Sequence, residues 1–131
     1  GIAVDYQPQN GMYAGVYQGI YNRIGLCTHE PKIFIHELAH AAHDMAGLLR
    51  TSNKWQKETV AELAAAVLAH LYGDTPDDGG AYRYIRGYAE GAGKDVYAAC
   101  MSVIADVSKC LDLIISQAET LSTQPEPIAA D

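Results

Sequence analysis

The chain has 131 residues, of which 49% are hydrophobic and 19% charged; this balance excludes a disordered protein and predicts one globular domain. The formal net charge is −7 and the nine lysines and arginines do not cluster, which argues against nucleic acid or a membrane as a partner of this domain. Three cysteines without metal-ligand spacing predict core thiols in a reducing, cytoplasmic compartment. Because the chain starts abruptly at Gly1, without a leader, we expect a fragment of a longer protein.

The N-terminal part of the chain predicts a small antiparallel sheet. Side chains alternate in character over residues 12–17, as they do in a strand with one buried face. The other two predicted strands cover residues 2–6 and 24–27, and a turn is expected at residues 18–23.

A helix is predicted over residues 28–50. Thr28 can cap its first turn, and Pro31 is tolerated there because residues of the first turn donate no intrahelical hydrogen bond. Apolar residues then recur at helical spacing. They are Ile35, Leu38, Ala42, Met45 and Leu49.

The rest of the chain predicts three more helices, over residues 55–72, 81–91 and 95–121, with an Asp- and Gly-rich loop at 74–80. The last helix carries an apolar stripe that we expect in the core: Val96, Cys100, Val103, Val107, Cys110 and Ile114. A disordered tail is expected over residues 122–131. The prediction is therefore an α+β fold, with a small N-terminal antiparallel sheet and a mostly helical remainder, forming one domain over residues 1–121.

The motif His36-Glu37-Leu38-Ala39-His40 lies on the first long predicted helix. His36 and His40 are four residues apart, so both imidazoles leave the same helix face and can bind one Zn²⁺. Glu37 follows the first histidine directly, a position from which a carboxylate can act as general base on a metal-bound water. These residues predict a metal site with Glu37 as its catalytic residue.

A third ligand is expected from the next helix. The metzincin spacing is excluded, since it places a histidine at position 46, which is Ala46. Glu58 and Glu62 lie one turn apart on the following helix, and the 17 residues between His40 and Glu58 allow that helix to return antiparallel. We assign Glu58 as the ligand and Glu62 as the carboxylate that orients a ligand histidine. The reverse assignment, with Glu62 as ligand, stays open.

Other polar residues are not assigned to the site. His43 lies about one turn beyond His40 and can flank the metal, whereas His29 and His70 are expected to lie outside the site. A tyrosine hydroxyl can stabilise an oxyanion in a zinc peptidase. Four tyrosines are candidates, and the sequence does not choose among them: Tyr17, Tyr82, Tyr84 and Tyr88.

The runs KIFIHELAHAAHD and WQKETVAELAAAVLAHLYG resemble the zincin-like metallopeptidase domain at the C-terminal end of ArdC-type antirestriction proteins and, more distantly, the ImmA/IrrE peptidases. The resemblance extends more loosely over AYRYIRGYA and the last helix, and so covers most of the chain. It implies a gluzincin-like site in which His36, His40 and Glu58 hold the metal and Glu37 is catalytic. ArdC-type proteins also carry an N-terminal domain that binds single-stranded DNA, which this chain lacks, and the resemblance implies such a domain in a full-length protein.

The expected function is that of a zinc-dependent metallopeptidase domain, which hydrolyses peptide bonds through a metal-activated water with Glu37 as general base. The two-histidine, one-glutamate donor set favours one zinc ion over manganese, cobalt or iron. The alternative is an inactive module in which the metal staples two helices and the domain binds a partner protein. A fourth protein ligand, with His43 as the candidate, would favour that alternative, because catalysis needs an open position. A different hydrolysis is the third alternative.

Overall fold

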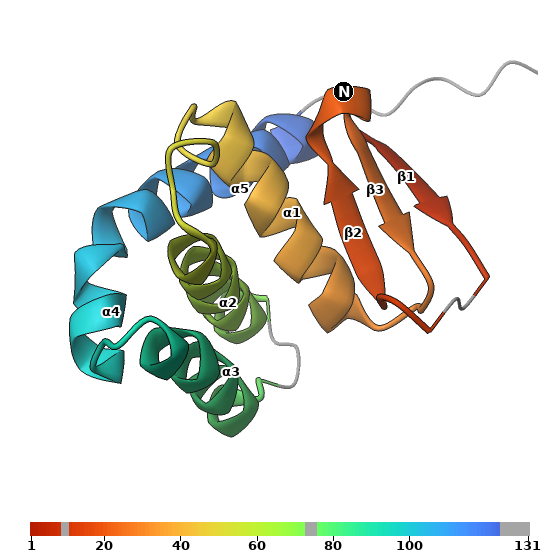
Figure 1. Cartoon of the computed structure of the whole chain (residues 1–131). Helices are drawn as coiled ribbons and strands as arrows, with labels where there is room; N and C mark the ends of the chain where they lie inside the picture. The colour runs from red at the N-terminus through yellow and green to blue at the C-terminus, as the bar shows by residue number, and fades with distance from the viewer. Residues whose placement is uncertain (9–10, 73–75, 124–131) are drawn as a thin grey trace, which may run out of the picture.

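The computed structural model describes residues 1–8, 11–72 and 76–123 and shows a small sheet beside a helical bundle (Figure 1). The sheet is formed by β1 (Ala3–Tyr6), β2 (Gly15–Gln18) and β3 (Arg23–Leu26), with a short 3-10 turn, η1 (Gly19–Tyr21), between the last two. The α+β prediction is confirmed. The helices follow in chain order: α1 (Pro31–Met45), α2 (Lys54–Leu71), α3 (Asp78–Gly91), α4 (Val96–Ser102) and α5 (Ile104–Thr123).

The sheet is mixed rather than antiparallel. Its order is β1-β3-β2, with β2 antiparallel to β3 and β1 parallel to it. The prediction of an antiparallel sheet is therefore right for β2 and wrong for β1. The prediction assumes hairpin pairing of consecutive strands, whereas β1 skips β2 and pairs with β3, a crossover that allows parallel pairing. Asp5 on β1 forms an ion pair with Arg23 on β3 across this parallel pairing.

Helix α1 lies between the sheet and the other helices (Figure 1). On the sheet side, Ile24 and Leu26 of β3 are buried against Ala41 of α1. On the opposite side, a second core joins α1 to α2 and α5 and consists largely of small side chains, which let helices approach closely. Its buried members are Ala39, Ala42, Val60, Ala61, Ala64, Val103, Val107 and Cys110.

The single helix predicted over residues 95–121 is two helices. The chain leaves helical geometry at Val103, with φ −109° and ψ 6°, and α5 turns back to pack on α1 and α2. The predicted apolar stripe is nevertheless on the inner side, because Val103, Val107 and Cys110 are all buried. The buried part of the stripe begins at this break, because Val96 and Cys100 of α4 are only partly buried.

Several predicted boundaries shift. Helix α1 ends at Met45 rather than residue 50, and Gly47 follows with φ 78°, a conformation that glycine adopts without strain. Helix α3 begins at Asp78, inside the predicted 74–80 loop, because the Asp77 side chain caps it by accepting a hydrogen bond from the Gly80 N–H. Ser122 and Thr123 still belong to α5; residues 73–75 and the rest of the predicted tail lie outside the described residues.

Two further expectations concern cysteines and membranes. Cys27, Cys100 and Cys110 are free thiols, but only Cys110 lies in the core as predicted, and burial raises the pKa of its thiol to about 11. Within the described part of the chain, no helix combines the length and hydropathy needed to cross a bilayer.

Gly15 lies where β2 passes closest to α1, and we predict that Gly15→Ala destabilises the protein. A Cβ at this position would lie 2.7 Å from Ile33 Cγ2 and 3.2 Å from Glu37 Cγ, so the strand or the helix must shift. The expected loss is about 1–3 kcal/mol in the free energy of unfolding, measured by urea denaturation. Gly87→Ala on α3 is the matched control: its Cβ meets nothing within 4 Å, and it should stabilise by about 0.5–1 kcal/mol. Equal effects of the two substitutions would contradict the prediction.

Candidate metal centre

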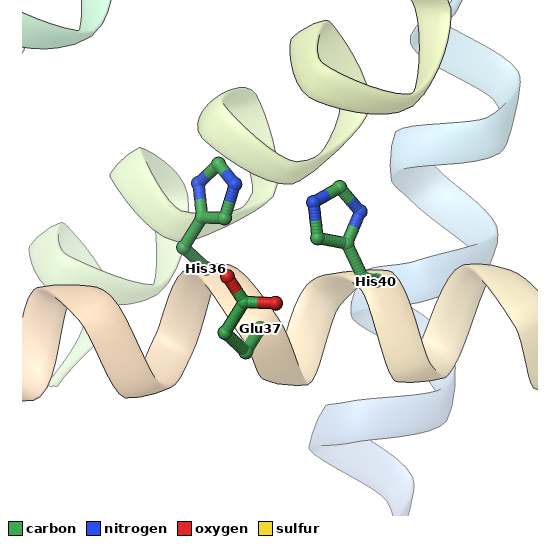
Figure 2. Close-up of side chains that lie close together, drawn as sticks. All are labelled: His36, Glu37 and His40. Atoms are coloured by element: carbon green, nitrogen blue, oxygen red, sulfur yellow. The ribbon is translucent and has the colours of Figure 1, made fainter. Parts of the chain in front are cut away.

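The two motif histidines leave α1 on one side and point toward α2 (Figure 2). Their rings meet edge to face, with centroids 4.8 Å apart, as the four-residue spacing on a helix requires. Donor atoms of His36, Glu37 and His40 lie within 4.8 Å of one another. No other group of three or more histidine, cysteine or acidic side chains among the described residues has donor atoms this close together, and Glu58 is not part of this group.

Glu58 of α2 faces both histidines at once. Its Oε2 lies 3.1 Å from His36 Nε2, and its Oε1 lies 3.5 Å from His40 Nε2. The two helices pack side by side, so an acid on the facing side of α2 can reach both imidazoles of α1. The structure therefore brings together the three residues that the sequence predicts as ligands.

The spacing of these donors fits a zinc ion. Ligand atoms about 2.0–2.1 Å from a tetrahedral Zn²⁺ are separated from each other by roughly 3.3 Å. The distances from Glu58 to the two Nε2 atoms, 3.1 Å from Oε2 and 3.5 Å from Oε1, are close to that value, although each is measured from a different oxygen of the carboxylate. Two neutral imidazoles and one carboxylate form a donor set that Zn²⁺ prefers. His36, His40 and Glu58 are thus the residues that could hold the metal.

Glu62 contacts the other nitrogen of His36. Its Oε2 lies 2.9 Å from His36 Nδ1, and its side chain is buried. A carboxylate on Nδ1 keeps the proton there and leaves Nε2 as the free donor toward a metal. Of the two acids on α2, the geometry favours Glu58 as ligand and Glu62 as the orienting group, because Glu58 alone faces both Nε2 atoms.

In the absence of an ion, the buried histidines and glutamates of the site pair with each other through hydrogen bonds and opposite charges. Burial alone would lower the pKa of His36, but hydrogen bonds to Glu58 and Glu62 outweigh it and raise the pKa to about 9. Burial alone would raise the pKa of Glu58, and hydrogen bonds with His36 and His40 instead hold it far below its usual range. At neutral pH the metal-free site therefore holds His36 as a cation, and a binding metal must displace its proton.

Glu37 lies on the side of α1 that faces β2. Its side chain is buried, and burial raises the pKa of its carboxyl although His40 and His36 act in the opposite direction. The backbone of Tyr17 donates a hydrogen bond to this carboxylate. Glu37 also borders an open pocket of about 350 Å³, whose other lining residues include Tyr13, Gly15, Lys32, Ile33, His36 and Tyr84. The predicted catalytic carboxylate thus faces a space that a substrate can enter.

The remaining histidines lie outside this group. His43 is fully buried, and its Nε2 lies 2.9 Å from Asp106 Oδ2 on α5. The rings of His29 and Tyr6 contact each other in a tilted arrangement, with centroids 4.3 Å apart and an interplanar angle of 30°. His70 pairs with Asp78, at 3.0 Å from its carboxylate. The expectation that His29 and His70 stand apart from the site is consistent with these positions, and His43 is engaged by α5.

The structure adds one residue that the sequence does not single out. The Tyr84 hydroxyl on α3 donates a hydrogen bond to Glu58 Oε2 at 3.0 Å. Burial and the nearby Glu58 raise the pKa of Tyr84, so its hydroxyl remains a donor. Tyr17, Tyr82, Tyr84 and Tyr88 look alike in the sequence, and only the packing of α3 against α2 distinguishes Tyr84.

The metal-free protein is predicted to lose stability as pH rises from about 6.5 to about 9. The folded-state pKa of His36 lies above its ordinary value of 6.5, so its stabilising contribution is complete below pH 6.5 and is lost as pH rises through about 9. Melting temperatures measured in a chelating buffer across this window should fall. His36→Gln should reduce that fall, and His70→Gln, which alters an exposed pair, should not. The same slope in His36→Gln as in the parent would contradict the prediction.

Comparison of the chain with protein-family models, curated proteins and solved structures finds no match. The likeness to ArdC-type metallopeptidase domains therefore remains an expectation based on the two sequence runs. The candidate metal centre rests on the positions of His36, Glu37, His40, Glu58 and Glu62.

Proposed function

We propose that this chain is a zinc-dependent metallopeptidase domain. The observation that carries the proposal is the Glu58 carboxylate, which spans the Nε2 atoms of His36 and His40 while Glu37 lies beside them at an open pocket. A site with three protein ligands and a neighbouring carboxylate is the arrangement of catalytic zinc in hydrolases. The resemblance of the HELAH and ETVAEL segments to ArdC-type domains supports the same reading.

In this proposal His36, His40 and Glu58 hold the ion and Glu37 moves the proton. A zinc ion held there would supply Lewis acidity and would lower the pKa of a water toward neutrality. The Glu37 carboxylate would act as the general base, taking a proton from the attacking water and giving it to the leaving amine. Its buried position and its hydrogen bond from the Tyr17 backbone hold it in one place for both transfers.

The substrate is proposed to be an extended peptide segment aligned on the edge of β2. The Cys27 N–H donates to Ala14 C=O at 2.8 Å, so residues 14 and 27 form a hydrogen-bonded pair. Hydrogen-bonded and non-hydrogen-bonded pairs alternate in an antiparallel ladder, so Gly15 and Tyr17 direct their backbone groups away from β3. No other described strand pairs with that edge. The Tyr17 N–H already donates to Glu37, so an added strand would pair with the Gly15 backbone groups and run past Glu37.

The alternative of an inactive, metal-stapled module is less well supported. It needs a fourth protein ligand, and His43 was the candidate. The His43 Nε2 already pairs with Asp106 on α5, at 2.9 Å. A coordination position open to water is thus part of the proposal.

The first test is metal binding. The purified protein should bind one Zn²⁺, and His36→Gln, His40→Gln and Glu58→Gln should each weaken that binding because each removes a donor. His70→Gln is the matched control, since it alters a histidine–carboxylate pair outside the site. Binding can be followed by competition with a chromophoric zinc chelator. Zinc binding that survives all three site substitutions would rule out this centre.

The second test separates metal binding from catalysis. Glu37→Gln should bind zinc as tightly as the parent, because Glu37 is not a proposed ligand, and should lower turnover by roughly 10²–10⁴-fold. A mixed library of fluorescence-quenched peptides provides the assay. Retained cleavage in Glu37→Gln would contradict the general-base role, and absence of cleavage by the zinc-loaded parent on any peptide would favour the inactive module.

A further inference from the structure

Helix α3 reaches the candidate metal centre through one side chain, Tyr84. Its hydroxyl donates to Glu58 Oε2 at 3.0 Å, and the same oxygen lies 3.1 Å from His36 Nε2. Its ring also meets the His36 ring edge to face, with centroids 5.7 Å apart and an interplanar angle of 80°. Tyr84 therefore contacts one proposed ligand by a hydrogen bond and a second by its ring.

The hydrogen bond restricts a side chain that is otherwise free to turn. The terminal torsion of a glutamate is broad, so the carboxylate of an unsupported Glu58 could rotate away from the two histidines. A donor on Oε2 fixes the plane of that carboxylate. In this orientation Oε1 faces His40 Nε2 at 3.5 Å while Oε2 faces His36. Partners of this kind commonly contribute 10–100-fold, approximately, to metal affinity.

Tyr84 is itself held in place. The Tyr88 ring, one turn further along α3, packs against it with centroids 5.2 Å apart. Two residues before Tyr84, Tyr82 is more than half exposed and lines a different pocket, with Arg86 and Tyr97. Both tyrosines are partly exposed, Tyr84 at 40% and Tyr82 at 53%, and of the two only Tyr84 donates a hydrogen bond to Glu58.

We propose that Tyr84 is a positioning residue that orients the Glu58 carboxylate for metal binding. The inference rests on the proposed function in one respect, the assignment of Glu58 as a ligand. It adds α3, through the Tyr84 hydroxyl, to a centre otherwise built from α1 and α2.

The test compares Tyr84→Phe with Tyr82→Phe. Each substitution removes one hydroxyl from α3 and keeps the ring, so the helix is expected to remain folded. Zinc affinity, measured by competition with a chromophoric chelator, should fall roughly 10-fold in Tyr84→Phe and stay at the parent value in Tyr82→Phe. In the Co²⁺-loaded proteins, the visible absorption bands should shift in Tyr84→Phe alone, because they report the geometry around the ion.

A double-mutant cycle then tests whether Tyr84 affects zinc affinity through Glu58. If Tyr84 acts through Glu58, Tyr84→Phe should cause no further loss of zinc affinity in a Glu58→Ala background. A full additional loss there would mean that the tyrosine does not act through Glu58 and would overturn the inference. Equal zinc affinities and Co²⁺ spectra for Tyr84→Phe and Tyr82→Phe would overturn it as well. A parent protein that binds no zinc would overturn the proposed function itself, an outcome distinct from the other two.

Discussion

Two helices, α1 and α2, enclose two histidines and two glutamates. Each of these buried side chains needs a hydrogen-bonding or oppositely charged partner. The exposed fractions of the His36, His40, Glu58 and Glu62 side chains lie between 6% and 16%, so none of them can rely on water. Burial of a charge without a partner costs several kcal/mol, approximately, and the four groups avoid that cost by pairing across the interface. Removal of His36 would leave Glu62 buried without its histidine partner, and removal of Glu58 would do the same to His40. The α1–α2 packing and the candidate metal centre are therefore one set of interactions.

This arrangement also explains the composition around the site. The helix contact beside the four polar groups is made by Ala39, Ala42, Ala61 and Ala64, all of them buried. Larger side chains there would separate the helices and lengthen the distances from Glu58 to the histidines. The apolar contribution is supplied elsewhere, by Val103, Val107 and Cys110 of the C-terminal helix and the residue before it. The alanines of α2 thus set the distance between ligands on different helices.

Much of the site is predictable from the sequence because its residues lie in pairs that are close together in the chain. His36 and His40, and again Glu58 and Glu62, are four residues apart within single helices, so their faces follow from helix geometry alone. Interactions between distant segments are not encoded in that way. The parallel pairing of β1 with β3, the break at Val103, the His43–Asp106 pair and the Tyr84–Glu58 hydrogen bond each depend on how separate elements pack. No periodicity in the chain distinguishes them.

Almost the whole circumference of helix α1 is covered by neighbouring elements. From residue 33 to residue 44 no side chain is exposed, because the sheet, α2 and α5 each take part of its circumference. Ala41 faces β3, His36 faces α2 and His43 pairs with α5. Since successive residues of an α-helix are rotated by about 100°, inserting or deleting one residue within this stretch would turn every later side chain toward the wrong neighbour. The length of α1 between its ligands and its core contacts is thus as constrained as the identity of the ligands.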